Sequence, residues 1–495
     1  MSTPSAGSPR PGVRRKIKQT GFGHTVLWTV GVALVPALLL ALTGLYVVRT
    51  HRSALLKIAL EPQSLRWIAI GCVAAIVLWV ALILTTYHFA RPARPTRRQN
   101  LFGSLLAVIL SMAVAGSLAT GARYAMVTRD LINTVAPNEH TVTAPKIVHI
   151  TKTDPWGNKA RVNLLLLGGD GGVGRTGIRT DSVILLSIDT HTGSSVMFSL
   201  PRNLRNVPFP AGSPLHALYP HGFEQCCDAG EEMLNAVYRN VPAAHPGAIG
   251  RTDNEGADAV KLAVSGALGI PVDYYLLVNL NGFRQIVDAI GGITVNINEP
   301  VPINGDTDRH IPPTGYLQPG PHQHLNGFKA LWFTRGRYGS TDYKRMERQR
   351  CAINAIVDEA DPVNLLTRYT RLANASKKIL RTDVPQDLLP AFVDTTFKMK
   401  QHPIKSVVFK LSSEFNPNEP DFGYVHKAVR KALNPPPPKK LRPEGKRGLT
   451  GVVNAGTGLI DTRPQRPASP AAATDADSDC TYQPVAASGS VATTP

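Results

Sequence analysis

The stretch that decides the fold covers residues 161–203 and reads RVNLLLLGGDGGVGRTGIRTDSVILLSIDTHTGSSVMFSLPRN. It holds three apolar runs, at 162–167, 182–188 and 195–200, and each predicts a β-strand. Because these runs are almost continuously apolar, we expect both faces of their sheet to be covered.

Strand and helix patterns alternate after this stretch. Strands are expected at 274–280 and 293–297, and helices at 257–268, 282–289, 328–333, 342–359 and 363–372. This alternation predicts an α/β fold, an αβα sandwich with a mixed central sheet. The segment 300–321 is polar and rich in proline and glycine, which predicts a loop flanking the mouth of an active site. Its Asp306, Asp308 and His310 are interpreted as turn residues in preference to metal ligands.

Charged side chains mark the ends of the first strand runs. Asp170, Arg179, Asp181 and Arg202 all lie within three residues of the end of an apolar run. Carboxylates are ligands for divalent cations, and guanidinium groups bind phosphate oxygens in pairs of hydrogen bonds. The segment therefore indicates phosphoryl chemistry, although ordinary surface ion pairs would give the same pattern.

A second charged cluster, TRGRYGSTDYKRMERQR, occupies residues 334–350. It offers Arg335 and Arg337 two residues apart, followed by Asp342, Arg345 and Gln349 on an expected helix, where the last two share a face. A solvated basic helix is the alternative. The preceding run FKALWFTRGR is partly apolar, however, and this favours the lining of a pocket.

Six sequence motifs, in their order along the chain, resemble those of one family. They are LLLLGGD, RTDSVILLSID, SLPRN, GIPVDYYLLVNLNGFRQIVDAIGGITVNI, HLNGFKALWFTRGR and DYKRMERQR, and they fall within 162–380. The order is similar to that of the LytR-CpsA-Psr family of cell-wall enzymes. The resemblance implies a phosphotransferase that moves an anionic glycopolymer from a polyprenyl-pyrophosphate carrier onto peptidoglycan, leaving a phosphodiester. It also implies a divalent cation, Mg²⁺ or else Mn²⁺, and an arginine-lined diphosphate site at the mouth of an apolar lipid cavity.

The resemblance assigns roles to matching positions. It implies that Asp170 and Asp181 hold the metal and that Asp342 and Gln349 orient the arginines. The diphosphate would be surrounded by Arg179, Arg202, Arg335, Arg337 and Arg345. One departure concerns the family block KxNxAY, which we align with SPLHALYPHG at 213–222. Ser213 or Pro214 then stands in place of the lysine, and His216 or His221 could substitute for it.

Composition agrees with a protein of the cell envelope. The chain has 495 residues, of which 43% are hydrophobic, and a formal net charge of +19 with a pI near 9.8. Such a charge would also suit nucleic acid, but the sequence has no helix-turn-helix or zinc-ligand spacing. We therefore expect no nucleic-acid partner.

Three uncharged apolar runs, 26–48, 67–87 and 101–121, are each near the ~20 residues that a membrane-spanning helix needs. Nine basic residues flank the first span and fill the loop between the second and third spans. They are Arg10, Arg14, Arg15, Lys16, Lys18, Arg91, Arg94, Arg97 and Arg98, against Arg49, Arg52, Lys57 and Arg66 in the other loop. This asymmetry places the amino terminus in the cytoplasm and everything after residue 121 outside.

The expected organisation follows: a basic tail (1–25), a membrane region (26–121), a stalk (122–154) whose first part is helical, an extracytoplasmic catalytic domain (155–433), and a proline-rich linker with a disordered tail (434–495). Cys351 is predicted to form a disulfide with Cys226 or Cys227, since an exported domain permits such bonds.

Two alternatives to the transferase remain open at this stage. One is a non-catalytic scaffold or regulator that binds polyprenyl diphosphates. The other is a pyrophosphatase that hydrolyses the same carrier.

Overall fold

The structure is a computed structural model. It describes residues 58–90, 96–136, 141–145, 154–157, 159–169, 178–224, 230–307, 309–359, 380–435 and 480–483, together with isolated residues between 31 and 50, residue 147, and the backbone of 474–475. The chain divides into two compact units, 1–55 with 63–126 and 56–62 with 127–495.

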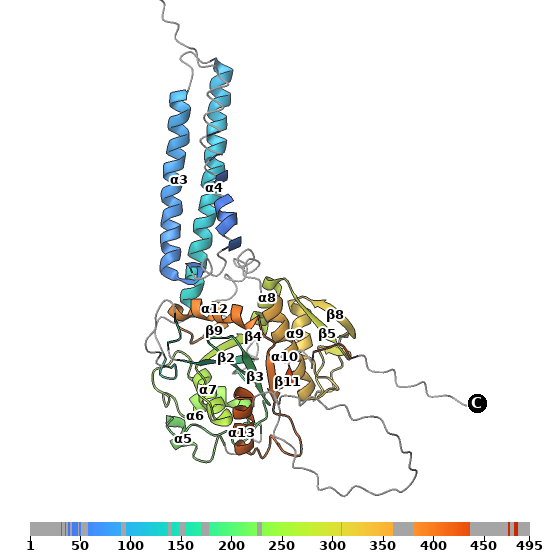
Figure 1. Ribbon diagram of the computed structural model, residues 1–495. Coiled ribbons are helices and arrows are strands. Elements are labelled where there is room, and N and C mark those ends of the chain that lie inside the picture. Colours follow the sequence, from blue (N-terminus) through green and yellow to red (C-terminus); the bar gives the residue numbers. More distant parts are fainter. Residues whose placement is uncertain are drawn as a thin grey trace, which may run out of the picture. The chain divides into compact units, whose positions relative to one another are not determined.

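The first unit contains two long apolar helices, α3 (Pro62–Ala90) and α4 (Arg97–Val135) (Figure 1). Both are long and apolar enough to cross a membrane. In the apolar 18-residue stretch of each helix only 11% of the residues are buried, so most of these side chains face outward. They contain the predicted spans 67–87 and 101–121. The predicted span 26–48 lies largely outside the described residues. Because α4 continues to Val135, the first part of the expected stalk is helical.

The second unit is built on a seven-stranded mixed sheet with the order β11-β10-β3-β2-β1-β4-β9. The predicted strands are confirmed as β1 (Arg161–Gly169), β2 (Thr180–Asp189), β3 (Ser195–Leu200) and β4 (Tyr274–Asn279). The edge strands are β9 (Leu380–Thr382) and β11 (Thr474–Asp475), and β10 (Lys405–Val408) lies between β11 and β3. β1 and β3 run antiparallel to β2, whereas β1 is parallel to β4 and β3 to β10, so the sheet is mixed as predicted.

Alternate residues of the strands face two different cores. Leu165 and Leu185 pack with α6 (Leu234–Ala244), α7 (Glu255–Leu268) and α13 (Phe422–Leu433). Ile184 and Leu186 face the opposite side, where α12 (Leu389–Met399) covers the sheet (Figure 1). The sheet is therefore covered on both faces, which explains why its strands lack polar alternation.

A third core lies beside the sheet. It is enclosed by α8 (Leu280–Ile290), α9 (Gly327–Arg335) and α10 (Asp342–Glu359), with the strand pair of β5 (Ile293–Ile297) and β8 (Gly320–Leu325). The remaining short elements are α5 (Pro214–Leu218) and a 3₁₀ turn at Gln386–Leu388. The predicted helix at 363–372 lies outside the described residues.

The segment 300–321 differs from the expected loop, because β6 (Val301–Ile303) and β7 (Gly315–Leu317) form a two-stranded antiparallel sheet within it. Val301 and Leu317 are opposite each other and bury their side chains in the third core. Burial of these apolar residues outweighs the polar, turn-rich composition of the rest. Asp306 does act as a turn residue, since its carboxylate accepts the Arg309 backbone N–H at 3.1 Å.

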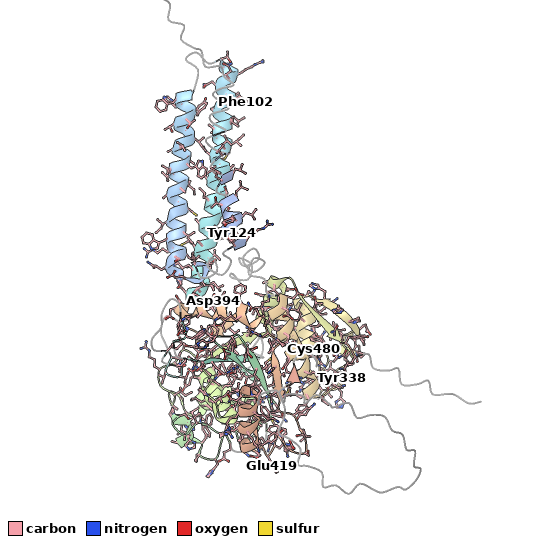
Figure 2. All side chains as sticks on the ribbon, viewed as in Figure 1. Phe102, Tyr124, Tyr338, Asp394, Glu419 and Cys480 are labelled. Carbon is pink, nitrogen blue, oxygen red and sulfur yellow. A yellow bond between two sulfur atoms is a disulfide. The ribbon has the colours of Figure 1, made fainter. Side chains whose placement is uncertain are left out.

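The predicted disulfide is wrong in its partner. Cys351 on α10 is bonded to Cys480, which lies 129 positions later in the sequence, and their Cα atoms are 5.5 Å apart (Figure 2). The tail is further held by Asn296 and Asn298, which donate to the Cys480 and Thr481 carbonyl oxygens at 2.9 and 3.2 Å. Residues 480–483, expected to belong to a disordered tail, are thus fastened to the domain. Cys226 and Cys227 lie outside the described residues.

Candidate functional site

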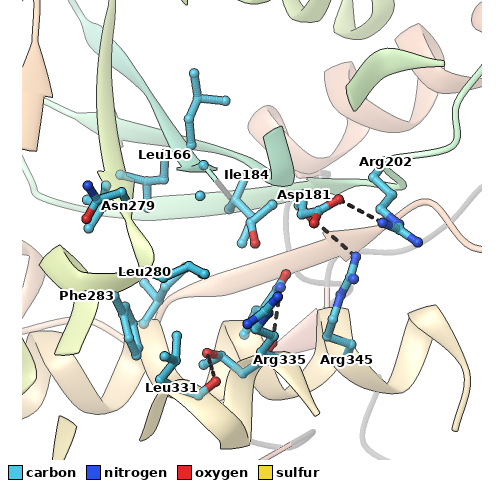
Figure 3. Close-up of a pocket in the computed structure, with 18 of the residues that line it drawn as sticks. Leu166, Asp181, Ile184, Arg202, Asn279, Leu280, Phe283, Leu331, Arg335 and Arg345 are labelled. Atoms are coloured by element: carbon cyan, nitrogen blue, oxygen red, sulfur yellow. Dashed lines mark hydrogen bonds and ion pairs between the residues drawn. The ribbon is translucent and has the colours of Figure 1, made fainter. Parts of the chain in front are cut away.

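A cavity of about 600 Å³ opens between the sheet and helices α8, α9 and α10. Its lining is divided by chemistry. Charged side chains gather at one end, whereas leucine, isoleucine and phenylalanine side chains line the other, and Figure 3 shows both groups across one pocket. The cavity can therefore hold a molecule with an anionic head and an apolar body.

The charged end collects most of the side chains that the sequence singled out. Those that line the cavity are Arg179, Asp181, Arg202, Arg335, Arg337, Arg345 and Gln349. Asp342 lies directly behind them and contacts two of the arginines. Asp170, the other predicted metal ligand, lies outside the described residues.

Strand register explains why Asp181 and Arg202 meet. In the antiparallel pair β2–β3, Val183 lies opposite Leu200, and continuing this register past the end of β3 places Asp181 opposite Arg202. The Arg202 Nη1 atom donates to Asp181 Oδ1 at 2.7 Å. Two charged residues that are 21 positions apart in sequence thus form one ion pair.

Helix α10 adds the third and fourth members of this cluster. Asp342 Oδ1 lies 3.5 Å from Arg202 Nε, and its Oδ2 accepts from Arg345 Nη2 at 3.0 Å. Arg345 Nη2 also donates to the Asp181 backbone oxygen at 3.1 Å, which ties the helix to strand β2 (Figure 3). The two carboxylates therefore hold the two guanidinium groups side by side.

The charge balance of this cluster favours an ionised Asp181. Burial raises the pKa of its carboxyl group, but the neighbouring Arg202, Arg345 and Arg337 lower it by more, so the pKa lies below its ordinary value of 3.8. Burial lowers the pKa of Arg345, and the positive charges of Arg202 and Arg337 lower it as well. The cluster thus concentrates positive charge that an anionic ligand would relieve.

Arg335 ends α9 and Arg337 lies in the turn that follows, and side chains of α10 hold this region in place. The buried Arg348 donates to the Phe333 carbonyl oxygen at 2.7 Å and also to that of Gly336, so it caps the end of α9. Burial lowers the pKa of Arg348 to about 10. The Arg335 guanidinium stacks 5.5 Å from the centre of the Trp332 ring.

Gln349 lies against the same turn. Its side-chain amide donates to the Thr334 carbonyl oxygen at 3.3 Å, next to Arg335. Asp342 and Gln349 thus contact the arginines or the backbone that carries them, which is the geometry that an orienting role requires. The roles themselves stay predictions.

Glu231 is a charged residue of this region that sequence reasoning missed. Its carboxylate forms ion pairs with Arg179 and with Arg239, and it accepts from Asn240 Nδ2 at 2.8 Å. Burial raises the pKa of Glu231, but the hydrogen bonds from Asn240 and Arg239 and the charges of Arg179 and Arg239 lower it by more. No pattern of spacing pointed to this residue, since it lies in the turn before α6.

The apolar end of the cavity is lined by the sheet and three helices. Strands β1, β2 and β4 present leucine, isoleucine and valine side chains, and α8, α10 and α12 close the other sides. These residues are Leu166, Ile184, Leu186, Leu276, Val278, Leu280, Phe283, Ile286, Ile353, Ile356, Val357 and Met399. Within the sequence they cannot be told from ordinary core residues, so no pattern could have identified them.

Two histidines proposed as replacements for the family lysine lie elsewhere. His216 and His221 line a separate cavity of about 490 Å³ together with Phe209 and Tyr219. Neither His216 nor His221 lines the cavity that holds the arginines, so the structure does not bring either of them to the predicted diphosphate site. Asn235 on α6 does line it, and MLNAVY at 233–238 matches the asparagine and tyrosine of KxNxAY. With this match, Met233 would stand at the position of the lysine.

The segment 300–321 also contributes to the cavity, as expected for a segment at its mouth. Asn304, Gly305, Asp306 and Thr307 are among the lining residues. Among the residues that the structure describes, no three or more histidine, cysteine, aspartate or glutamate side chains are grouped to hold a metal ion. Asp181 offers a single ionised carboxylate, and Mg²⁺ is often bound by one or two carboxylates with substrate phosphates completing its shell. The donor set therefore fits a cation that the substrate helps to bind.

Comparison with known proteins agrees with this geometry. The sequence model of the LytR_cpsA_psr family matches residues 127–434.

The chain belongs to the LytR-CpsA-Psr family.

Several members or related structures are similar to it. The polyisoprenyl-teichoic acid–peptidoglycan teichoic acid transferase TagU of Bacillus cereus is 29% identical over 242 residues, which are 48% of this chain and 64% of that protein. The biofilm regulatory protein A of Streptococcus mutans is 29% identical over 229 residues, 45% of this chain and 50% of that protein. The chain thus matches between half and two thirds of the length of these two relatives. The crystal structure of TagV from B. subtilis has 24% sequence identity and a TM-score of 0.38, covering 55% of this chain and 97% of that one.

Proposed function

We propose that this protein transfers an anionic glycopolymer from a polyprenyl-pyrophosphate carrier to peptidoglycan. The observation that carries the proposal is the division of one cavity into an arginine-rich end and an apolar end. A polyprenyl diphosphate has the same division, with two phosphates at the head of a long hydrocarbon chain. Similarity to a teichoic acid transferase supports the choice of substrate class.

The apolar end would hold the prenyl chain. Its lining comes from rigid elements, with Leu166 and Ile184 on the sheet and Phe283 and Ile353 on the helices. Transfer of apolar surface from water into such a cavity is favourable by about 25 cal/mol per Å². This energy would anchor the carrier without using the charged groups, which leaves the arginines to act on the diphosphate.

The charged end would bind the diphosphate and stabilise the transferred phosphoryl group. Arg202 and Arg345 are already held in place by Asp181 and Asp342, so they need little reorganisation when the ligand arrives. Arg335 and Arg337 approach from the α9–α10 turn. Together these side chains would neutralise the charge that develops on the leaving polyprenyl phosphate.

The reaction can be written with all groups balanced. A hydroxyl oxygen of peptidoglycan, the muramyl C6 hydroxyl by family resemblance, attacks the phosphorus that carries the glycan. The bond from that phosphorus to the bridging oxygen breaks, polyprenyl phosphate leaves, and a phosphodiester joins glycan and peptidoglycan. The hydroxyl proton passes to Asp181, Asp342 or solvent. A loose transition state does not demand a strong base, which suits the lowered pKa of Asp181.

A divalent cation, held by Asp181 and by the predicted ligand Asp170, would supply further charge neutralisation at the diphosphate oxygens. The ionised state of Asp181 is what such a ligand requires. One carboxylate oxygen of Asp181 accepts from Arg202 at 2.7 Å, so Asp181 would contact both the cation and this arginine.

The proposal places the domain outside the cell. Three spans, with the amino terminus in the cytoplasm, would export all residues after 121, where lipid-linked polymer and peptidoglycan meet. The disulfide Cys351–Cys480 supports this, because such bonds form and persist in oxidising compartments.

A reconstituted assay tests the function. The purified full-length protein would be incubated with a polyprenyl-pyrophosphate-linked oligosaccharide and nascent peptidoglycan, with and without a chelator of divalent cations. We expect a chelator-sensitive phosphodiester between the two glycans. Release of free phosphate or polyprenyl phosphate without that bond would identify a pyrophosphatase instead. Binding without any turnover would indicate a scaffold or regulator, as the name of the S. mutans relative suggests for that protein.

A further inference from the structure

The group of arginines at the charged end of the cavity extends beyond the cavity along helix α6. Asn235 lines the cavity, and Arg239 lies four residues later on the same face of this helix. Arg239 is therefore one helical turn after Asn235, and it is not among the residues that line the cavity. Its side chain is 35% exposed, so it is accessible to a ligand at the rim.

A shared carboxylate links this arginine to the cavity. Glu231 pairs through Oε1 with Arg179, which lines the cavity, and through Oε2 with Arg239. Asn240 donates to Glu231 twice, to Oε2 at 2.8 Å and to the backbone oxygen at 3.2 Å. Arg179 also donates to the Gly230 carbonyl oxygen at 3.4 Å. Both oxygens of Glu231 are thus engaged, and the turn before α6 is fixed to the helix.

This arrangement holds two guanidinium groups on opposite sides of one carboxylate. Their side chains are 33% and 35% exposed, while Glu231 between them is 21% exposed. The two guanidinium groups share this one carboxylate, and both remain partly exposed to solvent. Arg179 lines the same cavity as Arg202 and Arg345, so the sugars next to a diphosphate bound there would come close to this pair.

We propose that Glu231 is a positioning residue and that Arg239 is a further binding residue, together recognising an anionic group on the glycan of the substrate. The ligand chemistry is a phosphate or carboxylate on the sugars nearest the diphosphate. This inference rests on the proposed function. It adds that the enzyme selects charged over neutral glycans through α6.

Binding of three probes to the full-length protein in lipid nanodiscs tests the inference. The probes are geranylgeranyl diphosphate, the same diphosphate linked to N-acetylglucosamine, and that glycolipid with a phosphate on its sugar. We expect wild-type protein to bind the phosphorylated probe most tightly. Arg239→Gln should weaken binding of that probe about tenfold, at the low end for a charge-assisted hydrogen bond because the site is partly exposed, and leave the other two unchanged. Arg430→Gln, an exposed arginine on α13, is the matched control and should change none of them.

Two further variants test whether Glu231 positions the arginines or only balances their charge. Arg239→Lys keeps the charge and should retain most of the preference for the phosphorylated probe. Glu231→Gln keeps the size of the side chain but loses the ion pairs, and it should weaken binding of the phosphorylated probe. If Glu231 were only a counter-charge, the same variant would tighten binding of every anionic probe, and the positioning role would be overturned.

The outcomes distinguish this inference from the function on which it rests. If wild-type protein binds none of the probes, the proposed function itself fails. If it binds all three but Arg239→Gln weakens them equally or not at all, only the inference fails. Unchanged melting temperatures of the variants would show that the fold is intact in each case.

Discussion

Asp181 combines one contact seen in the structure with one predicted role. It anchors Arg202 at 2.7 Å, and it is the one described residue of the predicted metal pair. Its position follows from strand register, so the residue pattern RTD before an apolar strand was enough to identify it. Glu231 could not be found in the same way, because its importance comes from the spatial meeting of Arg179 and Arg239, which no spacing encodes.

Replacing Asp181 by asparagine should separate binding from turnover. The amide keeps the size of the side chain but is a poorer ligand for a hard cation, so we expect turnover to fall at least about a hundredfold. Binding of geranylgeranyl diphosphate in the presence of a chelator should be equal or tighter, since the arginines lose a competing negative charge. Measuring both quantities on the same purified protein decides the matter. Wild-type turnover in the variant would remove Asp181 from the mechanism.

The lowered pKa of Asp181 also predicts how stability depends on pH. Because the folded-state pKa lies below 3.8, the ionised carboxylate stabilises the fold above the unfolded-state pKa, and this contribution disappears as the pH falls through the lowered value. The difference in melting temperature between wild type and Asp181→Asn should therefore be largest near neutral pH and shrink toward pH 3. A difference that stays constant over this range would contradict the shift.

At the scale of elements, the site depends on how closely β6 approaches the α9–α10 turn. Gly336 lies between Arg335 and Arg337, and a Cβ atom there would collide with the Pro302 carbonyl oxygen and lie 2.9 Å from that of Trp332. Its backbone has φ −56°, so the glycine is needed for space and not for an unusual conformation. The absent side chain lets the turn that carries both arginines pack directly on β6.

Gly336→Ala should therefore displace both arginines. We expect a loss of stability of about 1–3 kcal/mol, typical of overpacking, together with weaker binding of polyprenyl diphosphate. Gly339→Ala is a useful comparison: space around it is open, but its φ of +67° disfavours alanine. That variant should lose stability and retain binding. Equal binding by both variants and wild type would show that the turn tolerates displacement.

The disulfide makes helix α10 dependent on a distant part of the chain. Cys351 lies on the helix that also carries Arg345 and Gln349, and it is two residues from Gln349. Its partner could not be predicted, because the two cysteines are 129 positions apart in the sequence and a proline-rich segment lies between them. The strands and helices were predictable from local periodicity, whereas this contact depends on the tertiary path of the chain.

Loss of this bond should lower stability by about 2–4 kcal/mol, since the unfolded chain regains freedom over a long loop. Cys480→Ser, Cys351→Ser and the double variant should show nearly the same decrease in the free energy of unfolding, because each removes the same bond. Thermal unfolding of the three proteins checks this. A double variant much less stable than either single variant would mean that the side chains contribute mainly through packing.

The whole molecule combines two helices that are long and apolar enough to cross a membrane with a domain whose proposed substrate is itself anchored in a membrane. α3 and α4 contain the second and third predicted spans, and basic residues between them favour a cytoplasmic loop. With a cytoplasmic loop, α4 leads outward, and the disulfide of the domain agrees with that side. The first span, 26–48, then decides only where the amino terminus lies.

Reporter fusions resolve the arrangement at three positions. With three spans, a reporter after residue 433 should be active only outside the cell, whereas reporters before residue 26 and within 91–96 should be active only in the cytoplasm. If 26–48 does not cross, the amino-terminal reporter alone should change sides, because α3 and α4 would still export the domain. A cytoplasmic signal after residue 433 would instead overturn the proposed function, since peptidoglycan would be out of reach of the arginine cluster.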